Sequence, residues 1–208
     1  MPPGRVAEDV DLEDGRPPLR ILRPASSEAL IDEQAFAAGD EYLPYWAELW
    51  PSAVALARLV AREDLTSARV LELGCGLGLP ALAAARAGAR VTATDWAPDA
   101  ITAATDNAAA NGVTLQAVVA DWREPGPLVA RGPWDLVLAA DVLYEARAVA
   151  PLLALLEALA APRVLVADPS RATCEPFLEQ AAERWNLAAT RAPDRPMVRV
   201  HELRPRNS

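Results

Sequence analysis

The sequence predicts an α/β fold in which a doubly wound, mostly parallel sheet of seven strands carries helices on both faces. From residue 69 onward, short runs rich in β-branched residues and leucine alternate with alanine-rich runs of helical length. The strand runs are continuously apolar, which is typical of parallel strands covered on both sides. The last two runs are joined by residues 192–196, too few for a crossover helix, so we expect them to pair antiparallel.

Each element is expected from its own local pattern. A first clear helix begins at Pro51, because proline favours the first helical turn and apolar residues recur here with a period near 3.6. Residues 19–23 suggest a short strand and residues 26–38 a short helix or an irregular cover. The later strands are expected at 69–73, 90–94, 114–120, 134–140, 163–167, 186–191 and 197–203, and the later helices at 79–87, 98–110, 147–160 and 172–185.

The chain of 208 residues has the length of one domain with an N-terminal extension. Residues 1–18 are rich in proline, glycine and acidic residues, which is typical of a mobile tail. Residues 19–64 are expected to form an extension that ends in a cap helix. Residues 65–208 then form the main, ligand-binding domain.

The composition argues against several functional classes. A formal net charge of −9 makes nucleic acid a poor partner, because such a field repels phosphate. Two cysteines and one histidine do not suffice for a disulfide framework or a histidine-rich metal site, so we expect no metal. No apolar run suggests a membrane span or a signal peptide, and the expected location is cytoplasmic. All 20 basic residues are arginine, which fits a GC-rich genome or an enzyme that avoids modifying its own lysines.

A glycine-rich turn follows the strand at 69–73. Gly74, Gly76 and Gly78 precede a helix, and this first strand-to-helix turn of a doubly wound sheet lies at the edge where ligands bind. The spacing is G-x-G-x-G, and Leu79 stands where a dinucleotide fingerprint needs its third glycine. A tight packing turn is the alternative interpretation.

Acidic residues close the next two strands. Asp95 follows Gly74 by 21 residues, where a carboxylate can accept hydrogen bonds from both hydroxyls of a ribose. Asp121 can take the exocyclic amine of an adenine, and Trp122 can pack on the base. Either acid alone would be read as a surface or capping residue, but the three strand ends together favour a ligand that contains adenosine.

These segments resemble the seven-strand S-adenosylmethionine-dependent methyltransferases over about residues 42–203. The resemblance implies their Rossmann-like fold with its antiparallel last strand, and makes residues 65–208 the methyltransferase domain. It implies S-adenosyl-L-methionine as cofactor and S-adenosyl-L-homocysteine as product. It places beside the donor Glu72, Gly74, Gly76, Gly78, Asp95, Trp96, Asp121 and Trp122.

A narrower resemblance rests on residues 44–51 (PYWAELWP) and 141–144 (DVLY). Both are similar to the family-16 group, which includes protein-lysine methyltransferases and predicted nicotinamide N-methyltransferases. The resemblance implies N-methylation of a lysine side chain of a protein, or alternatively of a small amine or nitrogen heterocycle. The Asn/Asp-Pro-Pro-Tyr motif of adenine and glutamine N-methylases is absent.

The same resemblance suggests three roles near the transferred methyl. Asp141 positions the acceptor, Tyr144 flanks the methyl channel, and Trp50 closes over the methionine end of the donor. The alternatives are that Asp141 caps the helix after Arg147, that Tyr144 only packs, and that Trp46 and Trp50 share one helix face in the core.

Other residues and functions remain as weaker alternatives. Arg171 could recognise an acidic acceptor surface or could simply be solvated, and we assign no chemistry to His201, Cys75 or Cys174. A nucleotide-binding oxidoreductase and a donor-binding module without catalysis are the competing classes. The expected partner is a protein substrate or a small amine, and the sequence does not indicate an oligomeric state.

Overall fold

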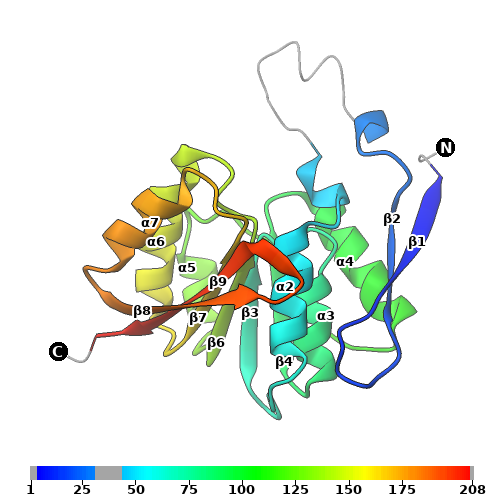
Figure 1. The fold of residues 1–208 in the computed structure, drawn as a ribbon, viewed down its shortest axis with the longest axis horizontal. Helices are drawn as coiled ribbons and strands as arrows, with labels where there is room; N and C mark the ends of the chain where they lie inside the picture. Colours follow the sequence, from blue (N-terminus) through cyan, green and yellow to red (C-terminus); the bar gives the residue numbers. More distant parts are fainter. Residues whose placement is uncertain (1–3, 31–43, 207–208) are drawn as a thin grey trace.

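The computed structural model describes residues 4–30 and 44–206. Its main sheet has seven strands in the order β5-β4-β3-β6-β7-β9-β8 (Figure 1). In this sheet β3, β4, β5, β6 and β7 are mutually parallel, and β9 runs antiparallel to both β7 and β8. The expected fold class is therefore confirmed. The strands are β3 (Arg69–Leu73), β4 (Arg90–Asp95), β5 (Gln116–Val119), β6 (Leu136–Ala140), β7 (Val164–Asp168), β8 (Trp185–Ala192) and β9 (Arg195–Pro205).

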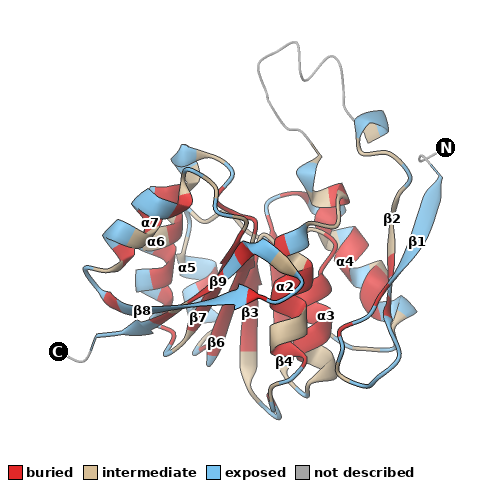
Figure 2. Ribbon diagram, viewed as in Figure 1, coloured by how far each residue is buried: buried red, intermediate tan, exposed pale blue. Residues whose placement is uncertain are grey.

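Helices cover both faces of this sheet, and alternate strand residues serve the two faces. On β6, Leu136 and Leu138 join the core beneath one set of helices, while Val137 and Ala139 join the core on the other side. Figure 2 shows the buried surfaces facing the sheet and the exposed surfaces facing outward. One face carries α2 (Pro51–Val60), α3 (Leu79–Arg86) and α4 (Pro98–Ala110), and the other carries α5 (Gly126–Ala130), α6 (Val149–Leu159) and α7 (Cys174–Ala181).

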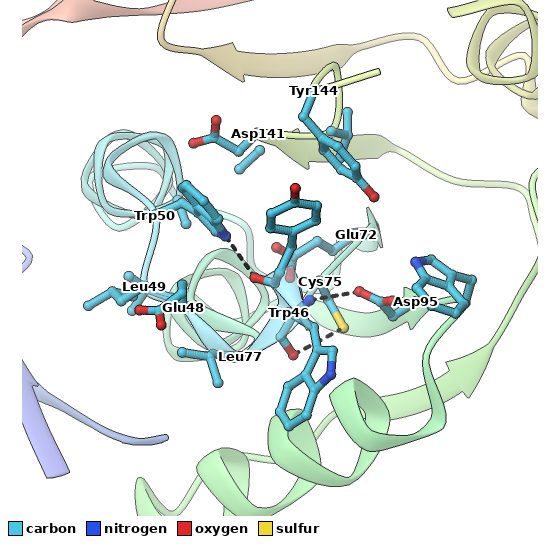
Figure 3. A pocket seen from close by; sticks show the side chains of 18 of the residues that line it. Trp46, Glu48, Leu49, Trp50, Glu72, Cys75, Leu77, Asp95, Asp141 and Tyr144 are labelled. Carbon is cyan, nitrogen blue, oxygen red and sulfur yellow. Dashed lines mark hydrogen bonds between the residues drawn. The ribbon is translucent and has the colours of Figure 1, made fainter. Parts of the chain in front are cut away.

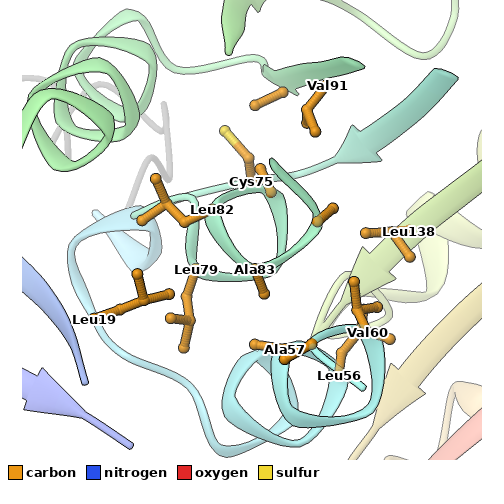
Figure 4. Close-up of a cluster of buried hydrophobic side chains, with 14 of the residues drawn as sticks. Leu19, Leu56, Ala57, Val60, Cys75, Leu79, Leu82, Ala83, Val91 and Leu138 are labelled. Atoms are coloured by element: carbon orange, nitrogen blue, oxygen red, sulfur yellow. The ribbon is translucent and has the colours of Figure 1, made fainter. Parts of the chain in front are cut away.

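The packing of α2 on α3 supports the ligand-binding edge of the sheet. Leu56 and Val60 of α2 are fully buried in the same cluster as Leu79 and Leu82 of α3, and Leu138 of β6 packs against this cluster from the sheet (Figure 4). Because α3 begins directly after the glycine turn, this packing fixes the position of the turn. Alanine at many α3 positions lets the two helices approach closely.

The elements expected from residue 69 onward are all present, with ends that differ by a few residues. The strand expected at 114–120 is limited to β5, and the helix expected at 172–185 is limited to α7. The short helix α5 was not expected. Trp46 and Trp50 do not share a helix face, because Trp46 lies in a 3-10 turn (Tyr45–Ala47) and Trp50 is the N-cap of α2.

The N-terminal region differs from the expectation of a mobile tail over residues 1–18. Strand β1 (Arg5–Val10) pairs antiparallel with β2 (Leu19–Pro24), and this hairpin packs on α4. Asn107 of α4 is fully buried and bonds the backbone of Leu22, while Asn111 bonds the backbone of Arg20. Of the cover expected at 26–38, residues 28–30 form a 3-10 turn and residues 31–38 lie outside the described residues.

Within the described ranges, no helix combines the length and the apolarity needed to cross a membrane.

Candidate active site

A cavity of about 240 Å³ opens at the carboxyl ends of the central strands. The ends of β3, β4 and β6 form its floor, and residues 45–53 form its cover. Figure 3 shows Trp50, Asp141 and Tyr144 around one side of the cavity and Asp95 on another. Of the residues predicted from the sequence, the lining includes Trp50, Glu72, Gly74, Gly76, Asp95, Trp96, Trp122, Asp141 and Tyr144.

The glycine turn is crowded by neighbouring segments. Gly74 and Gly76 both adopt positive φ, at 65° and 49°. A side-chain carbon at Gly76 would lie 3.1 Å from the carbonyl oxygen of Trp46, and one at Gly74 would lie 2.9 Å from Cγ1 of Val142. Glycine is therefore needed here for its conformation and for the close approach of the covering segment.

Gly78 lies outside the cavity lining and has a packing role. It is the N-cap of α3 with a φ of 81°, and a side-chain carbon there would lie 3.0 Å from Cβ of Ala104 on α4. The glycine turn therefore combines the two expected features, a turn that faces the ligand cavity and a tight packing turn. Its first two glycines face the cavity, and its third allows helix packing.

Two buried carboxylates mark the floor of the cavity. Asp95 accepts hydrogen bonds from the N–H groups of Gly76 (2.9 Å, Oδ2) and Ala97 (3.0 Å, Oδ1). Glu72 accepts from the N–H of Ala81 in the first turn of α3 at 2.9 Å. Burial raises the pKa of Asp95 and raises the pKa of Glu72 well above its ordinary value, in the latter case with a contribution from the nearby Asp95 charge.

Of the two site residues predicted at the end of β5, one lines the cavity and the other does not. Trp122 lines the cavity, with its ring 3.6 Å from the position of a side-chain carbon at Gly74. Asp121 lies outside the lining, and Arg123 binds both of its oxygens at 2.5–3.0 Å. These hydrogen bonds lower the pKa of Asp121. Trp96, next to Asp95, is 46% exposed at the rim.

Three aromatic rings stand at the mouth. The ring of Tyr45 lies 5.2 Å from that of Tyr144 and 6.2 Å, edge-on, from that of Trp50, measured between centroids. The indole N–H of Trp50 donates to the carbonyl of Tyr45 at 2.8 Å, which holds the cover in place. Burial raises the pKa of Tyr144, so its hydroxyl stays protonated. Tyr45 was not among the predicted site residues, although it adjoins Trp46 in the motif at 44–51.

Asp141 is held by Arg171 and does not cap a helix. Its Oδ1 accepts from Nε and Nη2 of Arg171 at 3.2 and 2.8 Å, whereas α6 begins after Ala148 without any side-chain cap. Asp141 has a φ of 57° and is 5% exposed. The guanidinium of Arg171 also lies 5.7 Å from the ring centre of Trp50. Arg171 therefore lines the cavity, and its contact with Asp141 differs from both roles considered for it from the sequence, an acidic acceptor surface or solvent.

The arrangement suits a ligand with hydroxyls at one end and positive charge near the middle. Asp95 accepts backbone hydrogen bonds through both oxygens, and a carboxylate has about four lone-pair sites in all, so it keeps acceptor capacity for a ligand hydroxyl. The acidic lining of Glu48, Glu72, Asp95 and Glu145 favours a cation. Trp122 offers a flat apolar surface for a base. These features fit an adenosine-containing sulfonium donor.

Comparison with known proteins agrees with this geometry. A family model described as lysine methyltransferase matches residues 44–184. The chain is 30% identical to protein N-lysine methyltransferase METTL21A of Danio rerio, over 84% of this chain and 85% of that protein. It is 36% identical to the electron transfer flavoprotein beta subunit lysine methyltransferase of Danio rerio over 64% of this chain, and spans about half (52%) of that relative.

A solved structure supports the fold independently. A TehB-like SAM-dependent methyltransferase from Corynebacterium glutamicum superposes with a TM-score of 0.61 at 19% identity, covering 86% of this chain and 98% of that chain. At this identity the likeness concerns the fold alone.

Proposed function

This chain belongs to the lysine methyltransferase family, and we propose that its own acceptor is a lysine side chain of a protein substrate. The enzyme is a methyltransferase that uses S-adenosylmethionine. The observation that supports an amine acceptor is the buried Asp141, which lines the same cavity as Asp95 and has one oxygen that no described residue hydrogen-bonds.

The donor is assigned to the floor of the cavity. Asp95 would accept hydrogen bonds from the ribose, Glu72 would face the charged methionine part, and Trp122 would pack on the adenine, with Trp96 at the rim. Gly74 and Gly76 let the ligand approach the backbone. We assign the adenine end to Trp122 alone, because Asp121 lies outside the lining, where its carboxylate binds Arg123.

The acceptor is assigned to the mouth. Tyr45, Tyr144 and Trp50 line the cavity together, so an alkyl chain would lie against aromatic surfaces there, and these rings would favour a cationic or polarised amine. Asp141 would accept a hydrogen bond from the amine and point its lone pair inward. When bound, S-adenosylmethionine supplies a methyl group on a positively charged sulfur.

The contribution of the protein to this reaction is alignment and exclusion of water. The acceptor nitrogen must lie in line with the methyl group and must be neutral when it reacts. Residues 45–53 cover the cavity and limit access of water, and the carboxylates fix both reactants. No covalent nucleophile of the protein is required.

The experiment uses labelled methyl donor, the purified protein and a lysate of its own host. We expect label on a discrete protein band, on lysine after hydrolysis, with the Asp141→Asn variant reduced about 100-fold or more. Asp9→Asn, on the exposed strand β1, is the matched control and should keep the wild-type rate.

Binding of S-adenosylhomocysteine to each variant separates loss of chemistry from loss of folding. Label confined to the low-mass fraction would move the assignment to a small amine. Wild-type rates from a folded Asp141→Asn variant would remove Asp141 from the mechanism.

A further inference from the structure

Arg171 is the one basic residue among the described residues that line the cavity. Every other charged side chain there is acidic: Glu48, Glu72, Asp95, Asp141 and Glu145. An acidic lining suits a cationic donor, but it does not explain why the guanidinium of Arg171 lies at the acceptor end. The contacts of Arg171 provide the explanation.

The loop after β7 places Arg171 in contact with Asp141, which directly follows β6. Its backbone N–H donates to Oδ1 of Asp168 at 2.7 Å, which fixes the turn. Its side chain then reaches Asp141 with two N–H groups and stacks near Trp50 of the cover. The guanidinium thus joins three segments that are far apart in sequence.

Only one of the two carboxylate oxygens of Asp141 takes part in this contact. Oδ1 takes both N–H groups of Arg171, while Oδ2 is buried and has no partner within the described residues. The side chain of Asp141 is 2% exposed. A buried carboxylate oxygen without a donor is costly, and Asp141 is a residue of the cavity lining, so a donor from a ligand is the partner that the unpaired oxygen lacks.

We propose that Arg171 is a positioning residue for methyl transfer: it holds Asp141 through Oδ1, balances its charge and leaves Oδ2 to accept a hydrogen bond from a neutral acceptor amine. This inference rests on the proposed function and refines it.

The charge balance decides the protonation state of the acceptor. An unpaired buried carboxylate would bind the amine as an ammonium ion, whose nitrogen has no free lone pair. A carboxylate paired with a guanidinium has little net charge, so it accepts a hydrogen bond without stabilising the ammonium form.

The transfer itself then balances simply. The ammonium first loses a proton to water, and the nitrogen lone pair forms the new N–C bond while the C–S bond breaks and its electron pair returns to sulfur. The methylated product is again an ammonium ion. Asp141 and Arg171 neither gain nor lose a proton in this step.

The test compares binding of a cation with turnover. The probe is n-butylammonium, a lysine side-chain analogue, titrated at pH 7.5 into protein saturated with S-adenosylhomocysteine and followed by NMR. Arg171→Gln should bind it about tenfold more tightly than the wild type, because Asp141 becomes an unpaired anion. Turnover on the labelled protein band should fall at least tenfold in kcat, without a rise in the KM for that protein.

Two further variants control the experiment. Arg171→Lys keeps the charge but loses the fork of two N–H groups, so it should bind n-butylammonium like the wild type while its kcat falls. It also carries the test if Arg171→Gln does not fold. Arg191→Gln, on the exposed edge strand β8, should match the wild type in both measurements.

Opposite changes in cation affinity and kcat are the signature, because a merely structural defect would weaken both. Equal affinities of wild type and Arg171→Gln for the probe, or an unchanged kcat, would overturn the inference. The proposed function fails separately, when the wild type labels no protein band.

Discussion

The side-chain amide of Asn107 forms a two-way bridge to the backbone of Leu22. The N–H of Leu22 donates to Oδ1 at 2.7 Å, and Nδ2 donates back to the Leu22 carbonyl at 3.2 Å. The same Nδ2 donates to the carbonyl of Leu77 in the glycine turn at 3.0 Å. One buried amide therefore connects the N-terminal hairpin, α4 and the cofactor turn.

Replacing Asn107 by alanine should destabilise the protein by about 3 kcal/mol, because it leaves several backbone groups in a buried place without partners. Urea unfolding measures the loss. Asn111→Ala is the matched variant: its amide makes the same two-way bridge, to Arg20, in a more exposed place. It should cost only about 1 kcal/mol, and equal losses from the two variants would contradict the buried-bridge argument.

The hairpin also shows where sequence-based prediction stops. From residue 69 the periods of strand and helix determine each element locally, and the short turn at 192–196 identifies the antiparallel pair. Residues 5–10 show little apolar pattern, so their strand depends on pairing with β2, which in turn packs on α4. No pattern within the hairpin could reveal its bonds to the amides of Asn107 and Asn111, which lie 85 and 91 residues further along the chain than the residues they bond.

The candidate site also contains residues that the sequence predicts and residues that depend on the tertiary arrangement. Gly74, Gly76 and Asp95 follow directly from positions at strand ends, because parallel strands bring their carboxyl ends to one edge. The pairing of Asp141 with Arg171 depends on the side-by-side arrangement of β6 and β7 and on the turn after Asp168. Asp121 occupies the predicted strand end, but its carboxylate binds Arg123 and the residue lies outside the cavity lining.

A second prediction concerns the contact between Gly76 and the covering segment. Gly76→Ala should lower the affinity for S-adenosylhomocysteine at least tenfold, because a methyl group 3.1 Å from the Trp46 carbonyl displaces the cover. Gly112→Ala is the control, since Gly112 also has positive φ (63°) but no atom within 4 Å of the added carbon. Calorimetric titration should show normal binding for Gly112→Ala, and similar binding by both variants would show that the close approach is unimportant.

The two strand-end acids provide a third prediction. Asp95→Asn should weaken binding of S-adenosylhomocysteine about 10- to 100-fold, because it removes a charged acceptor for the ribose and places an amide beside the Gly76 N–H. Asp121→Asn should change the affinity less than about threefold, since its carboxylate contacts Arg123. A strong effect at Asp121 would mean that its side chain turns into the cavity when ligand binds.

The buried carboxyl of Glu72 predicts a pH-dependent conflict between stability and binding. Because burial raises its pKa well above the ordinary 4.5, the folded protein favours the protonated form. The contribution of Glu72 to stability is therefore complete below the unfolded-state pKa and is lost as the pH rises through the folded-state pKa. Glu72→Gln keeps an oxygen for the Ala81 N–H and removes the buried charge.

We therefore expect Glu72→Gln to be more stable than the wild type at pH 8, by about 1–3 kcal/mol, with the difference vanishing below about pH 4.5. Chemical denaturation across pH 4–8 measures this, with Glu179→Gln on α7 as a control in which the charge is removed from an exposed position. The same variant should bind S-adenosylhomocysteine more weakly, because the charge that destabilises the empty cavity is the one that faces the methionine ammonium. A Glu72→Gln variant that is less stable than the wild type at pH 8 would show that the carboxylate is stabilised by its surroundings even without ligand.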